Sequence, residues 1–204
     1  LFILFLAAQW SIGQSSLPSS IANEKKAVIQ SLEAKKQQYV DVATNIWNLA
    51  ELGYKEGKSA NLLQSMLKEE GFTIENGVAG IPTAFTATFG SGTPVIGVLG
   101  EYDALPGFSQ DAVPFKKELA GNTNGHACGH HLFGSASAAA AIAVKNWLKT
   151  TGRKGTIRFY GTPAEEGGAG KVYMVRAGLF QDVDAVIHWH PGDDNNANPI
   201  SSLS

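Results

Sequence analysis

The chain has 204 residues, of which 44% are hydrophobic, and its net charge is −2 with an isoelectric point near 6.2. This length can bury one sizeable core, which indicates one domain, or one domain with part of another. The 16 lysines and arginines are spread thinly, so no basic surface is expected that would capture a phosphate backbone. The composition therefore argues against a nucleic-acid partner and favours a small neutral or anionic substrate.

The chain begins with an apolar run, LFILFLAA, which is followed by Ser11-Ile12-Gly13, with small residues at positions 11 and 13. This pattern is typical of the apolar region of a secretory signal peptide, and it is too short to span a bilayer. We therefore predict a signal peptide at residues 1–13, export to the periplasm or the exterior, and no stable membrane span. A buried terminal helix is the alternative. A single cysteine, Cys128, agrees with export because it has no partner for an internal disulfide.

Two helices are predicted before the first strand. Between Ile21 and about Leu52, apolar residues recur at spacings of three, four and seven, which predicts one long amphipathic helix. Residues 59–70 repeat this pattern, and Gly71 follows at the position where a left-handed C-cap is expected.

Short apolar segments then alternate with helical ones, which predicts an α/β fold. Strands are expected at residues 72–78, 84–89, 94–100, 155–160 and 183–187. The near-continuous apolar character of residues 94–100 is typical of a strand that is covered on both faces by helices. Helices are expected at residues 132–148 and 169–177.

The histidines are concentrated in two places. Residues 121–134, GNTNGHACGHHLFG, contain three of the five histidines and the only cysteine, and the other two histidines are His188 and His190. Imidazole and thiolate are the side chains that bind borderline-soft transition metals best. This clustering predicts a metal site.

Four segments are expected to converge on that site. Asp103, the Glu165–Glu166 pair and His190 each follow the C-terminal end of a predicted strand, and ligands bind at that edge of an open α/β sheet. Residues 128–131 begin a helix, where free N–H groups favour a thiolate. Three of these segments also have a plainer interpretation: a helix or turn cap for Asp103, a solvated acidic loop for the glutamate pair, and an exposed or hydrogen-bonded histidine at the end of the last strand.

Metal-assisted hydrolysis is the chemistry that needs this set of side chains. A bound metal lowers the pKa of water, and a carboxylate takes the proton and passes it to the leaving group. Nucleophilic catalysis by Cys128 is the alternative, but it leaves the glutamate pair and His190 without a role.

The segments GHACGHH, EYDALP, GTPAEEGG and DAVIHWHPG resemble the aminoacylase/carboxypeptidase-type metallopeptidase superfamily, in its amidohydrolase branch. The resemblance implies a three-layer α/β/α catalytic domain with a mostly parallel mixed sheet and two divalent ions, Zn or Mn. It also implies hydrolysis of an amide between an acyl or aromatic acyl group and an amino acid, such as p-aminobenzoyl-glutamate. A dipeptidase, an N-acyl-amino-acid hydrolase and a non-catalytic metal-binding fragment remain alternatives.

The resemblance also assigns roles to individual residues. Glu165 is the implied general base, and Asp103 matches an aspartate that orients a ligand. His190, rather than His188, matches the family's histidine ligand. The implied metal ligands are Cys128 as the bridge, His130, Glu166 and His190.

Two departures from the family pattern have consequences. His131 stands where many relatives carry aspartate, so it is a candidate to take over that hydrogen-bonding role. Family members are also longer and supply a further histidine ligand late in the chain. We therefore expect residues 21–192 to be the N-terminal part of a catalytic domain, inactive alone, and residues 193–204 to begin an inserted lid. Assembly as a homodimer or heteromer is expected through that lid.

Overall fold

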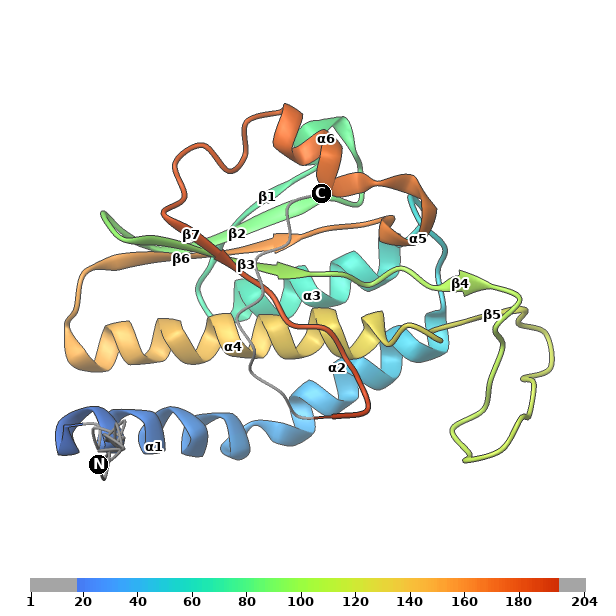
Figure 1. The fold of residues 1–204 in the computed structure, drawn as a ribbon, viewed down its shortest axis with the longest axis horizontal. Coiled ribbons are helices and arrows are strands. Elements are labelled where there is room, and N and C mark those ends of the chain that lie inside the picture. Colours follow the sequence, from blue (N-terminus) through green and yellow to red (C-terminus); the bar gives the residue numbers. More distant parts are fainter. Residues whose placement is uncertain (1–17, 195–204) are drawn as a thin grey trace, which may run out of the picture.

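The computed structural model describes residues 18–194, which form a five-stranded mixed sheet with helices on both faces (Figure 1). The strands are β1 (Thr73–Asn76), β2 (Phe85–Ser91), β3 (Val95–Gly100), β6 (Gly155–Gly161) and β7 (Ala185–Ile187), in the spatial order β1-β2-β6-β3-β7. Strand β3 is parallel to β6 and β7, and β2 is antiparallel to both of its neighbours. Only β2 is therefore reversed, which confirms the predicted mostly parallel sheet.

Helices cover the two faces unequally. Helices α3 (Gly57–Glu69) and α4 (His130–Thr151) contact one face, and α1 (Ser19–Ala34) and α2 (Lys36–Leu49) pack on α4 (Figure 1). The opposite face carries α6 (Gly170–Arg176) and the short 3-10 helix η1 (Val78–Gly80), whose Met174 and Val78 bury Tyr160 of β6. The predicted three-layer α/β/α fold is thus confirmed. No helix between residues 18 and 194 has the length and apolar character needed to cross a bilayer.

The predicted long helix before the sheet is wrong, because residues 19–49 form two helices. Lys35 leaves helical geometry at φ −111° and ψ 10° and separates α1 from α2. No glycine or proline marks this position. Its side chain forms an ion pair with Glu70 at the end of α3, while Trp147 of α4 donates a hydrogen bond to Glu24 of α1. Contacts with other helices therefore decide the break.

The predicted end of the second helix is confirmed. Gly71 follows α3 with φ +88°, and Phe72 N donates to Leu67 O at 3.1 Å while Gly71 N donates to Lys68 O at 2.9 Å. These are the two hydrogen bonds of a Schellman motif, which needs a left-handed residue where glycine has no steric penalty.

The prediction that residues 94–100 are covered on both faces is wrong for part of β3. Ile96 and Val98 are only half-buried, and they line an apolar groove of about 760 Å³ between the sheet and α4. Strand β7 forms the edge of the sheet beside β3 and has three exposed residues. The hydrophobic core lies instead between β2, β6, α3 and α4.

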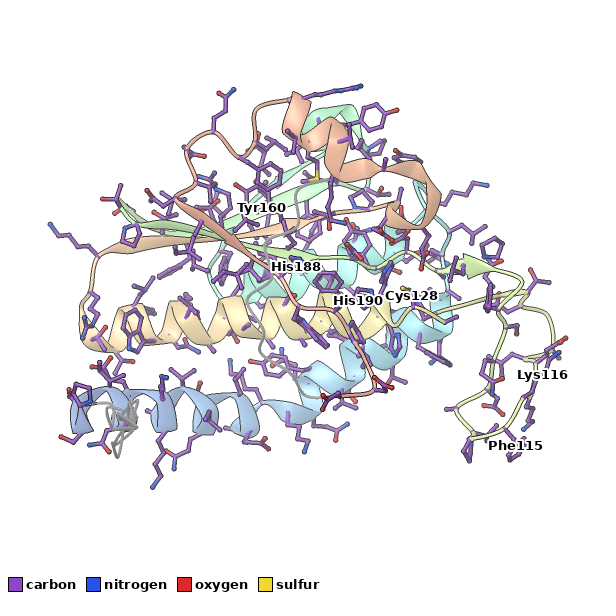
Figure 2. All side chains as sticks on the ribbon, in the orientation of Figure 1. Phe115, Lys116, Cys128, Tyr160, His188 and His190 are labelled. Atoms are coloured by element: carbon purple, nitrogen blue, oxygen red, sulfur yellow. The ribbon has the colours of Figure 1, made fainter. Side chains whose placement is uncertain are left out.

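The smaller elements lie near the C-terminal ends of the parallel strands. Strands β4 (Leu105–Pro106) and β5 (Asn124–Gly125) pair at the base of a loop that projects from the body, with Phe115 and Lys116 on it (Figure 2). Helix α5 (Glu165–Gly168) follows β6. The predicted signal peptide at residues 1–13 and nearly all of the polar tail at 193–204 lie outside the described residues.

Candidate metal centre

The C-terminal ends of three adjacent parallel strands bring the candidate site together. Glu101 and Asp103 follow β3, the pair Glu165–Glu166 follows β6, and His190 follows β7. The N-terminus of α4 lies at the same edge, and Figure 2 shows Cys128 and His190 beside one another there. The six side chains that the sequence points to therefore lie at one edge of the sheet: Asp103, Cys128, His130, Glu165, Glu166 and His190.

His130 is the buried centre of this cluster. Its ring is fully buried, and Nδ1 lies 2.8 Å from Asp103 Oδ1. The other carboxylate oxygen of Asp103 accepts a hydrogen bond from the Glu166 backbone N–H at 2.8 Å. Asp103 therefore fixes both the orientation of the imidazole and the position of the glutamate turn, and it directs Nε2 of His130 into the cluster.

Three carboxylates surround that Nε2 atom. It lies 2.8 Å from Glu101 Oε2, and 3.9 Å from both Glu165 Oε2 and Glu166 Oε1. The Nε2 atom, Glu101 Oε2 and Glu166 Oε1 are buried, and none has a well-aligned hydrogen-bond partner within residues 18–194. Buried polar atoms normally have hydrogen-bond partners. Three buried atoms that lack such a partner, and that can each coordinate a cation, therefore fit a metal ion at this position.

The second histidine approaches from the exposed side. His190 Nδ1 donates to the carbonyl of Pro191 at 2.9 Å, and its Nε2 lies 3.4 Å from Cys128 Sγ. Cys128, His130 and His190 each offer one candidate ligand atom, and these three atoms lie within 4.8 Å of one another. Since both histidines engage Nδ1 elsewhere, both present Nε2, which is the arrangement that metal-binding histidines use.

Glu101 is a site residue that the sequence analysis missed. Glu101, His130 and Glu165 form a second group whose candidate ligand atoms lie within 4.8 Å of one another, and Glu101 also forms an ion pair with Lys171 of α6. Burial opposes ionisation of Glu101, but the His130 ring and the Lys171 ammonium outweigh it and lower its pKa. The sequence signal for Glu101 was its position two residues before Asp103, because alternate residues of an extended segment share a face.

Electrostatics set the protonation of His130 and Cys128. Burial disfavours the charged imidazole, yet the hydrogen bond to Asp103 and the close carboxylate of Glu101 raise the pKa of His130 to about 10. The expectation that the helix N-terminus would favour a thiolate is wrong for the protein alone, because burial, followed by the charge of Glu166, raises the pKa of Cys128 to about 11. Cys128 therefore needs a cation to hold it as a thiolate.

Two of the remaining histidines form a neutral pair next to the centre. His126 Nε2 donates to the carbonyl of Ile46 at 3.1 Å, and the His131 ring lies edge-on to Trp47 with centroids 4.8 Å apart. Burial lowers the pKa of each to about 4. Neither belongs to the two candidate ligand groups, and within the described chain the buried Nδ1 of His131 has no hydrogen-bond partner. His188 lies beside Phe133, with ring centroids 6.2 Å apart.

Comparison with known proteins now decides the family. The profile of peptidase family M20/M25/M40 matches residues 97–201, the segment that carries every candidate ligand. The chain belongs to this family. Its sequence is 53% identical over 161 residues to a p-aminobenzoyl-glutamate hydrolase subunit of Escherichia coli, covering 78% of this chain and 34% of that protein. It is 34% identical over 168 residues to the Xaa-Arg dipeptidase of Homo sapiens, covering 74% of this chain and 35% of that protein.

Solved structures agree with the M20 assignment. A dinuclear metal-binding M20 peptidase of Bacillus subtilis superposes with a TM-score of 0.69 at 26% identity, covering 79% of this chain and 44% of that one. An aminobenzoyl-glutamate utilization protein of Klebsiella pneumoniae shares the fold, with a TM-score of 0.56 at 20% identity and coverage of 79% and 45%. The chain spans about a third of the length of the curated M20 relatives it matches.

Proposed function

We propose that the full-length protein is a metal-dependent amidohydrolase that cleaves the bond between an acyl or aromatic acyl group and an amino acid. The observation that carries this proposal is the convergence of Cys128, His130 and His190 within 4.8 Å, beside the carboxylate of Glu165. A thiolate, two imidazoles and a neighbouring carboxylate form a donor set for divalent ions of the zinc type.

The metal ligands that we propose are Cys128 as the bridge, His130, Glu166 and His190. Two divalent ions, Zn²⁺ or Mn²⁺, fit these residues, and the thiolate leans modestly toward zinc. Bound ions of this type supply Lewis acidity that polarises the substrate carbonyl. A likeness to a dinuclear M20 peptidase supports two ions rather than one.

Glu165 is the proposed general base. Its side chain is 45% exposed, in contrast to the buried His130, so it faces the space from which substrate and water arrive. In the reaction, the carboxylate takes a proton from the attacking water and then passes it to the leaving nitrogen as the amide bond breaks. Asp103 contributes by holding the ring of His130 and the N–H of Glu166.

The preferred substrate class is an aromatic acyl group joined to glutamate. The similarity to the E. coli hydrolase supports p-aminobenzoyl-glutamate, which would be cleaved to p-aminobenzoate and glutamate. A dipeptide substrate is the second candidate, because the human relative is named an Xaa-Arg dipeptidase.

The test is an assay of the full-length protein with Zn²⁺ or Mn²⁺ against p-aminobenzoyl-glutamate, N-acetyl amino acids and dipeptides. We expect metal-dependent hydrolysis, with the highest kcat/KM for p-aminobenzoyl-glutamate. Preference for a dipeptide would move the assignment to the second candidate, and absence of turnover with all three classes would contradict the proposal.

A Glu165→Gln variant tests the base separately. Since Glu165 handles the proton, we expect kcat to fall by roughly 100- to 10,000-fold while the metal content stays the same. Retained turnover would remove Glu165 from this role.

Export and assembly are separate proposals. The apolar run at residues 1–8 supports a cleaved signal peptide, which N-terminal sequencing of the mature protein tests. The E. coli relative is named as one subunit of a hydrolase, which supports assembly as a homodimer or heteromer. Light scattering of the full-length protein, with and without the products of neighbouring genes, tests this assembly.

A further inference from the structure

The turn that carries Glu165 and Glu166 begins in a conformation that its own sequence does not favour. Ala164 has φ 58° and ψ 41°, in the left-handed region, and only 1% of its surface is exposed. A residue with a Cβ atom in this region is sterically penalised, so the surroundings must hold it there. Whatever holds Ala164 also determines where the next two side chains point.

A buried glutamate makes the contact that holds it. Glu56, at the start of α3, is fully buried, and its Oε1 accepts a hydrogen bond from the Ala164 N–H at 2.8 Å. Asp103 accepts from the Glu166 N–H two residues later. Two buried carboxylates from different parts of the chain therefore hold alternate N–H groups of the turn.

Neighbours of Glu56 fit closely against the same turn. A Cβ atom added at Gly53 would lie 3.0 Å from the Ala164 Cβ atom. The hydroxyl of Tyr54 donates to the carbonyl of Gly168 at the other end of the turn. Residues 53–56 thus contact both ends of the glutamate turn.

This segment is also attached to the chain between β3 and β4, which carries Asp103. Leu52 forms a parallel bridge with Ala104, whose N–H donates to the carbonyl of Glu51 at 2.8 Å. The position of Glu56 is therefore coupled to the buried side of the metal centre, and not only to α3.

Burying the carboxyl group of Glu56 is energetically unfavourable, which indicates that its contact with Ala164 has a functional role. Its second oxygen, Oε2, is buried without a well-aligned hydrogen-bond partner among the described residues. Burial outweighs the hydrogen bonds that the carboxylate accepts and, together with the charge of Asp103, raises the pKa of Glu56. A buried carboxyl group with an unpaired oxygen lowers stability. Simple support of α3 does not need it, because Glu51 already accepts hydrogen bonds from Ser59 N and Ser59 Oγ, both at 2.8 Å.

We propose that Glu56 is a positioning residue, which holds Ala164 in its left-handed conformation and thereby aims Glu165 and Glu166 at the metal centre. The inference rests on the proposed function, because it assigns Glu56 to the support of the proposed ligand and base. Glu56 itself touches neither substrate nor metal.

The proposal is tested by comparing the activities of two single substitutions of Glu56 in the full-length protein. Glu56→Gln keeps the side-chain length and an acceptor oxygen, whereas Glu56→Asp keeps the charge and withdraws the oxygen by one methylene group. We expect Glu56→Asp to lower kcat on the order of 10- to 100-fold with little change in KM, and Glu56→Gln to remain near the unsubstituted enzyme. The reverse order, with Asp active and Gln impaired, would overturn the proposal.

A readout that needs no substrate separates this inference from the proposed function. Titration with Co²⁺ reports the coordination geometry through its visible absorption. We expect Glu56→Asp to alter that spectrum or weaken Co²⁺ binding, because Glu166 is displaced, and Glu56→Gln to leave both unchanged. An unaltered Co²⁺ titration in Glu56→Asp would contradict the inference even if no substrate were turned over.

Glu51→Ala is the matched control for a purely structural effect. It removes a carboxylate from the same end of α3 without touching Ala164, so we expect a lower Tm with an unchanged Co²⁺ spectrum and kcat. A loss in Glu51→Ala equal to that in Glu56→Asp would assign both effects to α3.

Ala164→Gly provides an independent variant. Glycine adopts the left-handed region without a steric penalty. Glu56→Asp should therefore lower kcat by a smaller factor in the Ala164→Gly protein than in the protein with Ala164. Equal losses in the two backgrounds would show that Glu56 does not act through this conformation.

Discussion

The two histidines that face the candidate metal centre are supported very differently. His130 is fully buried at the N-terminus of α4, and its Nδ1 is held by Asp103 at 2.8 Å. His190 is exposed beyond the three-residue edge strand β7, and its Nδ1 bonds only to the next residue, Pro191, within the described chain. The centre therefore has one preorganised side, built on the central strands, and one side whose position depends on the edge of the sheet.

This contrast shows what each side contributes. Ligands on buried, hydrogen-bonded elements are fixed before a metal binds, whereas an exposed ligand gains its fixed position on binding. Removing a group from the first side should therefore damage the folded protein itself, and removing one from the second should damage only metal binding.

Replacing each of the two histidines by alanine should give the largest difference in stability between the two sides of the centre. In metal-free protein, we expect His130→Ala to lower the free energy of unfolding by about 3–5 kcal/mol, because it leaves Asp103 as a buried carboxylate without its partner. His190→Ala should change it by about 0.5 kcal/mol or less, since exposed side chains contribute little. Urea unfolding with a chelator present measures both, and equal losses would remove the contrast.

The pH dependence of the metal-free protein should sharpen the comparison. The pKa of His130 is raised from 6.5 to about 10, so the folded state binds its proton more tightly than the unfolded state. Its contribution to stability should be complete below pH 6.5 and should be lost as pH rises toward 10. Unfolding free energies measured across this range should fall in the unsubstituted protein and fall less in His130→Gln. A flat profile would contradict the assigned interactions of His130.

A smaller effect should come from a buried ion pair remote from the centre. Burial opposes ionisation of Glu70, but Lys145 and Lys35 outweigh it and lower its pKa below 4.5. Because the folded pKa is depressed, this contribution should be complete above pH 4.5 and should be lost as pH falls through the folded value. Acid unfolding of Glu70→Gln should depend less on pH in this range, while its Co²⁺ spectrum stays unchanged. Acid sensitivity equal to that of the unsubstituted protein would exclude Glu70 as the cause.

The smallest effect should come from His188. Its ring contacts Phe133 and belongs to neither candidate ligand group, so His188→Ala should leave metal stoichiometry unchanged and alter stability by about 0.5 kcal/mol or less. Loss of one metal ion in this variant, measured by elemental analysis, would reverse the choice of His190 over His188.

Local patterns in the sequence were sufficient to predict most of the fold. Apolar periodicity placed the strands and the main helices, and Gly71 marked the end of α3. The break at Lys35 could not be predicted, because contacts with Glu70 of α3 and between α1 and α4 decide it. The exposed edge at β7 also depends on tertiary packing, which an apolar run does not reveal.

The candidate site was predictable where residue type and strand ends coincide. Asp103, the glutamate pair and His190 all follow strand ends, and the structure brings them to one edge. Glu56 could not be found in this way, because a single acid at the start of a helix resembles an exposed residue until Ala164 becomes its partner. The raised pKa of Cys128 likewise depends on burial in the folded chain and on the charge of Glu166, which lies far away in the sequence.

The most direct test of the metal centre is the near-ultraviolet spectrum of the full-length protein loaded with Co²⁺. A thiolate bound to cobalt gives a charge-transfer band, and we predict this band in the unsubstituted protein and its loss in Cys128→Ser. A cobalt-loaded protein without a thiolate band, or one whose band persists in Cys128→Ser, would contradict the account.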